Sequence, residues 1–328
     1  MADERRVLIT GATGFVGRYL IAHLHDAHPD WAVTGTTLGA EPFGEDTVHI
    51  VLCDLRDAGA TDALLAAVRP DAVFHLAGQS NVPISFADPE GTLTNNIVGT
   101  LHLLEACRAH APAARLLIVS SAEVYGVTPP EAQPLSEDRP FAPVSPYAVS
   151  KVTNELLARQ YAHSYGLDVI IARPFNHIGP GQAAKFVVST FARGIAEIER
   201  GQREVLKVGN LAVARDFSDV RDVVRAYDLL IQHGVRGGVY NIGRGEAHTV
   251  QWVLDLLRGL ATVSVRVERD PAIFRPSDAP LMVADTTRLR ADTGWAPRIP
   301  FAQTAADILN FWRQELDAPS ATSERTHT

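Results

Sequence analysis

The chain has 328 residues, of which 46% are hydrophobic and 21% charged, and its formal net charge is −8. This composition is typical of a globular protein, and the length predicts a large domain with a smaller one covering it. The acidic balance argues against wholesale nucleic-acid binding, which needs a dense basic surface. No apolar run approaches the roughly 18 residues of a membrane span, and no signal-peptide core precedes the first strand, so we expect a cytoplasmic protein.

Short apolar runs alternate with longer helical patterns over the first 170 residues. This alternation is typical of βαβ units and of a parallel sheet covered on both faces. The predicted strands are residues 6–10, 31–36, 48–52, 72–76, 115–120 and 168–172, and the predicted helices are residues 15–25, 58–68, 92–109 and 147–165. The sequence therefore predicts an α/β fold with a Rossmann-like, doubly wound parallel sheet.

The pattern loosens after Arg173, where Pro174, Gly179, Pro180 and Gly181 mark a long loop. A helix over residues 187–200 and mixed short elements are expected next, and the chain is expected to return once to the main sheet near residues 239–242. We therefore predict a dinucleotide-binding domain over residues 1–173, with a return near 214–243. A smaller C-terminal α/β substrate-binding domain over residues 174–316 and a disordered tail over 317–328 complete the prediction.

Three glycines, Gly11, Gly14 and Gly17, follow the first predicted strand and open the first predicted helix. In this context glycines allow a tight turn, close approach of backbone N–H groups to a pyrophosphate and close helix packing. The spacing is Gly-x-x-Gly-x-x-Gly instead of the commoner Gly-x-Gly-x-x-Gly. Its position between strand and helix predicts dinucleotide binding.

Polar residues after the later strands extend this cofactor site. Asp54 follows the third apolar run and could accept a hydrogen bond from an adenine amino group, although a solvated strand end is the alternative. The run Phe-His-Leu-Ala-Gly at 74–78 suits a backbone lying against the cofactor, and Asn96 could brace it. Residues 33–38 offer neither an acid for a free 2′-hydroxyl nor an arginine for a 2′-phosphate, so the choice between NADPH and NADH stays open.

Tyr147 and Lys151 stand four residues apart at the start of a helical pattern, so both side chains project from one face. An ammonium group beside a phenol is expected to lower the tyrosine pKa towards the range of proton exchange near neutral pH. Ser121 ends an apolar strand and could hydrogen-bond the same substrate oxygen. Together the three residues indicate proton transfer beside a hydride carrier.

At this point the sequence resembles the extended short-chain dehydrogenase/reductase family of nucleotide-sugar epimerases, dehydratases and reductases. The resemblance runs from Val7 to about Trp312 and rests on GATGFVG, DLRD, FHLAG, NNIVGT, SSAEVYG, SPYAVSK, RPFN and TGWAP in the family's order. It implies Ser121 as the oxygen-polarising hydroxyl, Tyr147 as the acid/base, and Lys151 as its electrostatic partner and a ribose ligand.

The candidate site residues fall into three groups. The catalytic candidates are Ser121, Tyr147, Lys151 and Glu123. The cofactor candidates are Gly11, Thr13, Gly14, Phe15, Val16, Gly17, Asp54, Leu55, Leu76, Ala77, Gly78, Asn96, Tyr147, Lys151 and Pro174. The substrate candidates are Gln79, Ser80, Asn176, Lys185, Arg215 and Arg275. Asn176 could equally serve a structural turn.

Within the family, the segments RPFNHIGPGQ at 173–182 and ARDFSDVRDVVRAY at 214–227 look most like the reductases that convert GDP-4-keto-6-deoxy-D-mannose to GDP-D-rhamnose. The implied chemistry is hydride delivery from NADPH or NADH to a C4 ketone. Glu123 occupies the position of a general base or acid in the family's 4,6-dehydratases, but Ala122 replaces one polar member of their triplet. A structural role for Glu123 is the alternative.

Several other interpretations stay open. A nucleotide-sugar 4-epimerase or a 4,6-dehydratase with tightly bound NAD(P) uses the same catalytic set, and a non-catalytic redox-sensing scaffold shares the fold. His23, His25 and His28 lack a convincing companion set, so no metal site is predicted. Cys53 and Cys107 fit reduced, buried positions. The resemblance implies a homodimer, with a tetramer as an alternative.

Overall fold

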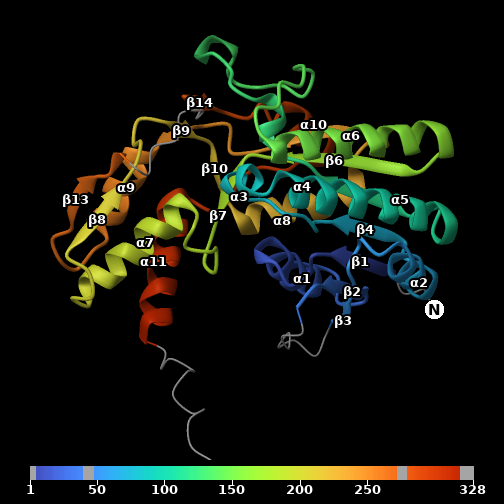
Figure 1. Ribbon diagram of the computed structural model, residues 1–328, viewed down its shortest axis with the longest axis horizontal. Coiled ribbons are helices and arrows are strands. Elements are labelled where there is room, and N and C mark those ends of the chain that lie inside the picture. The colour runs from blue at the N-terminus through green and yellow to red at the C-terminus, as the bar shows by residue number, and fades with distance from the viewer. Residues whose placement is uncertain (1–4, 40–47, 272–278, 318–328) are drawn as a thin grey trace, which may run out of the picture.

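The computed structural model describes residues 5–39, 48–271 and 279–317 and has two lobes lying side by side (Figure 1). The larger lobe is built on a seven-stranded sheet with the order β11-β6-β5-β4-β1-β2-β3, in which every neighbouring pair is parallel. Its strands are β1 (Arg6–Thr10), β2 (Ala32–Thr37), β3 (His49–Leu52), β4 (Ala72–His75), β5 (Arg115–Val119), β6 (Asp168–Pro174) and β11 (Val239–Ile242). The strand order reverses between β1 and β4, and ligands of such sheets bind at the carboxyl ends beside this switch point.

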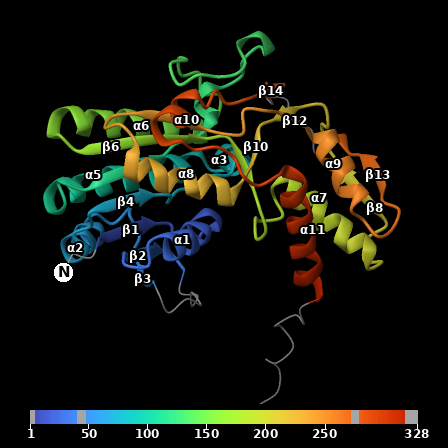
Figure 2. The ribbon, with the colours of Figure 1, turned by 180° about the vertical axis from the view of Figure 1, so that it is seen from behind.

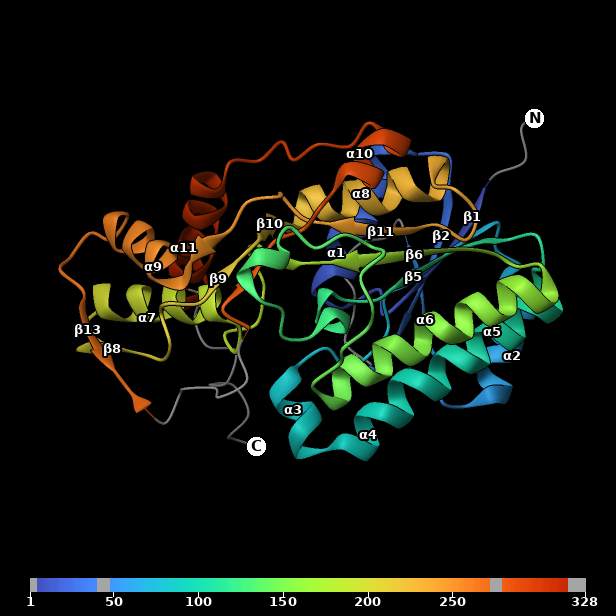
Figure 3. The same cartoon turned by 90° about the horizontal axis from the view of Figure 1, so that it is seen from above.

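Helices cover both faces of this sheet, with α8 on one side and α5 and α6 on the other (Figure 3). The helices of the first face are α1 (Phe15–Ala27) and α8 (Val220–His233), with α10 (Thr287–Thr293) beside α8; those of the second are α2 (Ala58–Val68), α5 (Gly99–His110) and α6 (Pro146–Tyr165). Two apolar cores follow, one on each face. Because both faces are buried, the central strands are continuous apolar runs instead of alternating ones.

The smaller lobe packs three helices and a two-stranded sheet around a third apolar core (Figure 2). Its helices are α7 (Val187–Glu199), α9 (Val250–Gly259) and α11 (Phe301–Asp317), and its paired strands are β8 (Val205–Val208) and β13 (Arg266–Arg269). Two further small sheets pair β7 (Asn176–Ile178) with β10 (Phe217–Asp219), and β9 (Ala214–Arg215) with β12 (His248–Thr249) and β14 (Leu281–Met282).

The predicted elements match the structure closely in the larger lobe. The strand at 6–10, the helix at 58–68 and the return to the sheet at 239–242 are confirmed with the same ends. The helix predicted over 92–109 is instead broken into α4 (Pro89–Leu93), a π-helical turn η1 (Thr94–Val98) and α5. Short elements not predicted are α3 (Val82–Ala87), η2 (Ala122–Tyr125) and η3 (Pro130–Ala132). The tail predicted to be disordered lies outside the described residues except for Asp317, which ends α11.

Within the described part of the chain, no helix combines the length and apolar character needed to cross a membrane. Cys53 and Cys107 are both buried free thiols, as expected.

An ion pair between α7 and α11 fixes the smaller lobe and makes its stability depend on pH. Arg313 donates to both carboxylate oxygens of Glu199, at 2.8 and 2.6 Å, and the Thr262 N–H donates at 2.8 Å. The Arg313 guanidinium lowers the pKa of Glu199 to about 2. Since the folded pKa lies below the unfolded value, this contribution is present above about pH 4.3 and is lost as pH falls towards 2.

We therefore expect Glu199→Gln to lower the free energy of unfolding at pH 7 by about 1–2 kcal/mol, after allowance for solvent screening. The difference from wild type should shrink as pH falls from 5 towards 2. Urea unfolding followed by circular dichroism at several pH values measures it. A difference that stays constant over this pH range would contradict the assignment.

Candidate active site

A cavity of about 1230 Å³ runs along the carboxyl ends of the sheet and into the smaller lobe. Its wall contains the glycine loop before α1, the ends of β4 and β5, the start of α6 and the segment around β7. Cavities that enclose one small ligand are typically about 300–1,000 Å³. This one therefore has room for a dinucleotide together with a second ligand.

The glycine loop is shaped so that only glycine fits at two positions. Gly11 has a φ of +71°, and a Cβ there would lie 2.9 Å from the Ala77 Cα. A Cβ on Gly17 would lie 2.4 Å from the Ala12 carbonyl oxygen. Because glycine has no side chain, the loop can lie close to the strand ends. The N-terminus of α1 then faces the cavity, which suits a pyrophosphate.

Two threonine hydroxyls hold this loop against the end of β2. Thr36 Oγ accepts from the Gly11 N–H at 3.1 Å, and the hydroxyls of Thr13 and Thr37 lie 2.8 Å apart. The Thr37 hydroxyl also accepts from the Gly39 N–H at 3.1 Å. Thr36 and Thr37 lie in the segment that offered neither an acid nor an arginine, and their hydroxyls fix the shape of the glycine loop.

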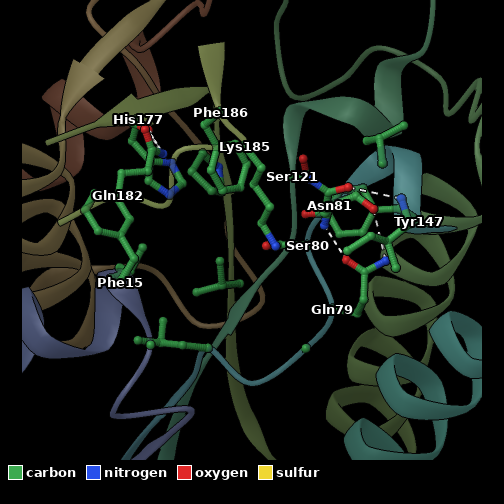
Figure 4. A pocket seen from close by; sticks show the side chains of 18 of the residues that line it. Phe15, Gln79, Ser80, Asn81, Ser121, Tyr147, His177, Gln182, Lys185 and Phe186 are labelled. Carbon is green, nitrogen blue, oxygen red and sulfur yellow. Dashed lines mark hydrogen bonds between the residues drawn. The ribbon is translucent and has the colours of Figure 1, made fainter. Parts of the chain in front are cut away.

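Most of the predicted site residues lie in the cavity wall. These are Gly11, Thr13, Gly14, Phe15, Val16, Gly17, Asp54, Leu55, Leu76, Ala77, Gly78, Gln79, Ser80, Ser121, Glu123, Tyr147, Lys151, Pro174, Asn176, Lys185 and Arg215. Asn96 is buried behind the wall. Arg275 lies outside the described residues. Figure 4 shows Ser80, Ser121 and Tyr147 on one side of the cavity and Phe15, His177 and Gln182 on the other, with Lys185 extending between them.

Asn96 braces the segment after β4, as the sequence suggested. Its Oδ1 accepts from the Gln79 N–H at 2.8 Å, and its Nδ2 donates to the Gln79 carbonyl at 3.0 Å and to the Ser150 hydroxyl at 2.9 Å. The residue sits in the π-helical turn η1. Such turns often mark functional sites, and this one positions a buried amide where it binds both the cavity wall and α6.

Asp54 has a partner that the sequence did not reveal. Arg56 Nε lies 3.0 Å from both carboxylate oxygens, and Arg56 Nη2 donates to Oδ2 at 2.6 Å. This side-chain hydrogen bonding lowers the pKa of Asp54. An adenine amino group would therefore share a carboxylate that already accepts from a guanidinium.

Tyr147 and Ser121 form the reactive pair in the wall. The Ser121 side chain hydrogen-bonds the Tyr147 phenol, and Ser121 Oγ also accepts from the Glu123 N–H at 3.2 Å. Burial raises the pKa of Tyr147 to about 12, the Ser121 hydrogen bond opposes this and the Glu123 charge adds to it. The expectation of a lowered tyrosine pKa is therefore wrong for this structure, because burial outweighs the hydrogen bond from Ser121. At neutral pH the phenol keeps its proton and can donate it.

Lys151 lies one helical turn after Tyr147, as predicted. Its Nζ donates to the Val119 carbonyl at 2.8 Å and lies 5.9 Å from the centroid of the Tyr147 ring. Burial lowers the pKa of Lys151 to about 8, and the Glu155 carboxylate opposes this. The side chain thus carries its charge at neutral pH and loses it in mildly alkaline solution.

A buried polar network behind the reactive pair was missed in the sequence. Arg173 donates to both oxygens of Glu155 at 2.9 and 2.7 Å, and the Ser120 hydroxyl donates to the same carboxylate at 2.5 Å. Arg173 Nη1 also donates to the Tyr125 hydroxyl at 2.9 Å. The network ties the ends of β5 and β6 to α6. In the sequence, the one sign of this network was the position of Glu155, four residues after Lys151.

Two further cavity residues were not predicted. The His177 and Phe15 rings are stacked, with centroids 6.3 Å apart, and Gln182 Nε2 donates to the His177 carbonyl at 2.9 Å. His177 and Gln182 belong to the RPFNHIGPGQ segment, which indicated a substrate loop as a whole but not these side chains. They connect the smaller lobe to the glycine loop.

The histidines for which no metal site was predicted do gather around a carboxylate. His23 Nε2 and His28 Nε2 each lie 3.0 Å from an oxygen of Asp228. This carboxylate lies on α8, far from the histidines in the sequence, so the sequence did not reveal it. His25 is not part of this contact. Across residues 5–39, 48–271 and 279–317, no group of three or more potential ligands has metal-binding geometry.

Comparison with known proteins gives consistent matches along the chain. The family profile described as GDP-mannose 4,6 dehydratase matches residues 8–308. The GDP-6-deoxy-D-mannose reductase of Pseudomonas aeruginosa is 38% identical over 313 residues, which cover 95% of this chain and 98% of that protein.

Two solved structures extend these matches. The structure of RMD from Pseudomonas aeruginosa complexed with NADPH superimposes with a TM-score of 0.83 and 37% identity, covering 94% of this chain and 99% of that one. A UDP-glucose 4-epimerase of Thermus thermophilus complexed with NAD gives a TM-score of 0.84 and 30% identity, covering 94% of this chain and 99% of that one.

Proposed function

Because this chain belongs to the GDP-mannose 4,6-dehydratase family of extended short-chain dehydrogenase/reductases, we propose that it is a nucleotide-sugar 4-ketoreductase using a nicotinamide dinucleotide. Its substrate is GDP-4-keto-6-deoxy-D-mannose and its product GDP-D-rhamnose. The reductase relative is similar over nearly the whole of both chains, which supports this reaction over the others in the family. The α/β fold and its switch-point cavity support the same class of chemistry.

The glycine loop, Leu76, Ala77 and Gly78 would hold the dinucleotide, with Lys151 as a ribose ligand and Pro174 as a further residue of this wall. Gly11 and Gly17 lie tightly against the neighbouring backbone, which supports this assignment. Without side chains at these positions, the backbone at the start of α1 is open to a pyrophosphate. A bound reduced nicotinamide supplies the hydride that the protein itself cannot provide.

The chain's own residues handle the proton and the developing charge. The Tyr147 phenol donates its proton to the C4 oxygen as the carbonyl becomes a hydroxyl, and the Ser121 hydroxyl holds that oxygen in place. The Lys151 ammonium stabilises the phenolate left behind. The observation that carries the proposal is the protonated, Ser121-bonded Tyr147 phenol in the same cavity as the glycine loop.

The nucleotide diphosphate lies towards the smaller lobe. Lys185 and Arg215 provide cationic donors on that side of the cavity, and Asn176 provides an amide. Gln79 and Ser80, at the opposite wall, are assigned to the sugar. Planar guanidinium and amide donors suit phosphate and hydroxyl acceptors.

Glu123 supports a second candidate function, 4,6-dehydration of GDP-mannose. Its carboxylate lines the cavity and acts electrostatically on Tyr147, so it lies near the position of the sugar. A 4-epimerase uses the same Ser-Tyr-Lys set and differs in consuming no added cofactor.

One assay separates these candidates. The purified protein is incubated with GDP-4-keto-6-deoxy-D-mannose and either NADPH or NADH, and absorbance of the reduced cofactor is followed while the sugar product is identified by NMR. Stoichiometric oxidation with formation of GDP-D-rhamnose is expected. Absence of oxidation with both cofactors would contradict the ketoreductase. Formation of a 4-keto sugar from GDP-mannose, or of an epimer without net oxidation, would support the alternatives.

Two further proposals concern the whole protein. Val149 and Leu156 on α6 are 42% and 53% exposed, which supports a homodimer formed through this helix. A sizing experiment giving twice the chain mass of 35.5 kDa would support it. The two buried thiols favour a reducing compartment such as the cytoplasm.

A further inference from the structure

Two consecutive residues at the end of β5 bind two charged side chains of α6. The Val119 carbonyl accepts from the Lys151 ammonium at 2.8 Å, and the Ser120 hydroxyl donates to the Glu155 carboxylate at 2.5 Å. Lys151 and Glu155 are four residues apart on this helix, so their side chains are neighbours on one face. They are 6% and 0% exposed, so water screens the attraction between their charges only weakly.

The charges around Lys151 come from α6 and from the elements that pack against it. The titratable groups that act on Lys151 or on its immediate partners are His75 on β4, Glu123 on η2, Arg173 on β6, and Tyr147, Glu155 and Arg159 on α6. Burial lowers the pKa of His75 to about 3 and raises that of Tyr147 to about 12, so both are uncharged at neutral pH. The charge that acts on the Lys151 ammonium is that of Glu155, which Arg173 binds.

The Glu155 carboxylate is thus shared between two buried cations. Arg173 is 1% exposed and binds both carboxylate oxygens, at 2.9 and 2.7 Å. A nearby opposite charge stabilises the charged form of a group, and a nearby like charge destabilises it. Loss of the carboxylate and loss of the guanidinium should therefore affect the Lys151 ammonium in opposite directions.

We propose that Glu155 and Arg173 are positioning residues that act through Lys151, because together they set the range of pH over which its ammonium stays charged. This inference rests on the proposed proton transfer, in which that ammonium stabilises the Tyr147 phenolate. It gives a role in the reaction to an ion pair that is buried behind the cavity wall.

The chain has three lysines, Lys151, Lys185 and Lys207, so Lys151 can be titrated directly without substrate or cofactor. The protein is labelled with ¹³C at the lysine Cε, and the NMR signal that is missing from Lys151→Arg is assigned to Lys151. Its titration midpoint is measured between about pH 6 and 11. In Glu155→Gln the midpoint should fall by about one pH unit or more, and in Arg173→Met it should rise by a similar amount. The Lys185 and Lys207 signals in the same spectra should titrate as in wild type.

Two further variants separate charge from packing. Glu155→Asp keeps a carboxylate but shortens its reach to Arg173, so it should recover at least about half of the shift that Glu155→Gln causes. This pair of variants keeps the test decisive if Arg173→Met does not fold. Arg159→Met removes an arginine that lies 3.7 Å from the same carboxylate but is 47% exposed, and it should move the midpoint by less than about 0.3 pH units.

The pH profile of ketone reduction connects this titration to the reaction. The fall of kcat/KM should begin at lower pH in Glu155→Gln and at higher pH in Arg173→Met. The proposal is overturned if Lys151 titrates in Glu155→Gln as in wild type, or if the kcat/KM profile does not follow the titration. Equal shifts in Glu155→Gln and Glu155→Asp, or a lowered midpoint in Arg173→Met, would also overturn it, since they indicate loosened packing. The expected titrations without ketone reduction would contradict the proposed reaction but not the link between the three charges.

Discussion

Replacing Tyr147 by phenylalanine is expected to lower kcat by about 10²- to 10⁴-fold, because the variant keeps the ring and loses the proton donor. The phenol is buried, and its pKa of about 12 keeps it protonated throughout the neutral range. Dinucleotide binding should remain within about threefold of wild type. Steady-state oxidation of the reduced cofactor measures kcat, and calorimetry measures the dinucleotide affinity.

Tyr161→Phe is the matched control, because Tyr161 lies on the same helix and its hydroxyl bonds to Glu105, away from the cavity. Its kcat should stay within about twofold of wild type. An equal loss in both variants would attribute the effect to α6 as a whole. A Tyr147→Phe enzyme with more than about a tenth of wild-type kcat would exclude the phenol as the proton donor.

The same mechanism predicts how the wild-type rate depends on pH. The pKa of Lys151 is about 8, so its ammonium is lost in mildly alkaline solution, while Tyr147 keeps its proton there. The pH dependence of kcat/KM reports the pKa values of groups in the free enzyme, so kcat/KM should fall above about pH 8. A profile that stays flat to about pH 9.5 would show that the charge on Lys151 is not needed.

The parts of the fold that were predicted correctly depend on local signals. The strand β1, helix α2 and strand β11 each have a clear apolar pattern between turn residues, and tertiary contacts do not alter their ends. The prediction of one continuous helix over 92–109 was wrong, because the apolar period of the sequence continues through η1 and does not reveal the break there. The π-helical turn forms where Asn96 bonds to the backbone of Gln79, a contact 17 residues away that no local pattern contains.

The candidate site divides in the same way. Ser121, Tyr147, Lys151 and the glycines could be placed because their spacing relative to strand ends and helix starts is itself the signal. The direction of the Tyr147 pKa could not be predicted, because it is set by competition between burial and nearby charge. The depth of burial depends on the whole fold.

The largest effect on stability is expected from Arg173→Met. Arg173 and Glu155 are 1% and 0% exposed, and the guanidinium binds both carboxylate oxygens. Methionine preserves much of the side-chain volume but removes the guanidinium that binds both oxygens of the buried Glu155 carboxylate. That carboxylate keeps the Ser120 hydroxyl, Arg159 at 3.7 Å and the electrostatic attraction of Lys151. Breaking one side of such a pair typically costs about 3–5 kcal/mol. Denaturant unfolding should show a loss of this size.

The paired variant Glu155→Gln/Arg173→Met distinguishes loss of charge balance from loss of packing. Removing both charges takes away the uncompensated carboxylate, so the double variant should be more stable than Arg173→Met alone, by about 1 kcal/mol or more. Arg258→Met, which breaks an exposed pair with Asp255, should change stability by no more than about 0.5 kcal/mol. If the double variant is no more stable than the single one, the arginine acts through its packing against Tyr125 and Phe141 instead of through its charge. If it recovers as expected, the charged network is the element that holds the ends of β5 and β6 against the helix bearing Tyr147 and Lys151.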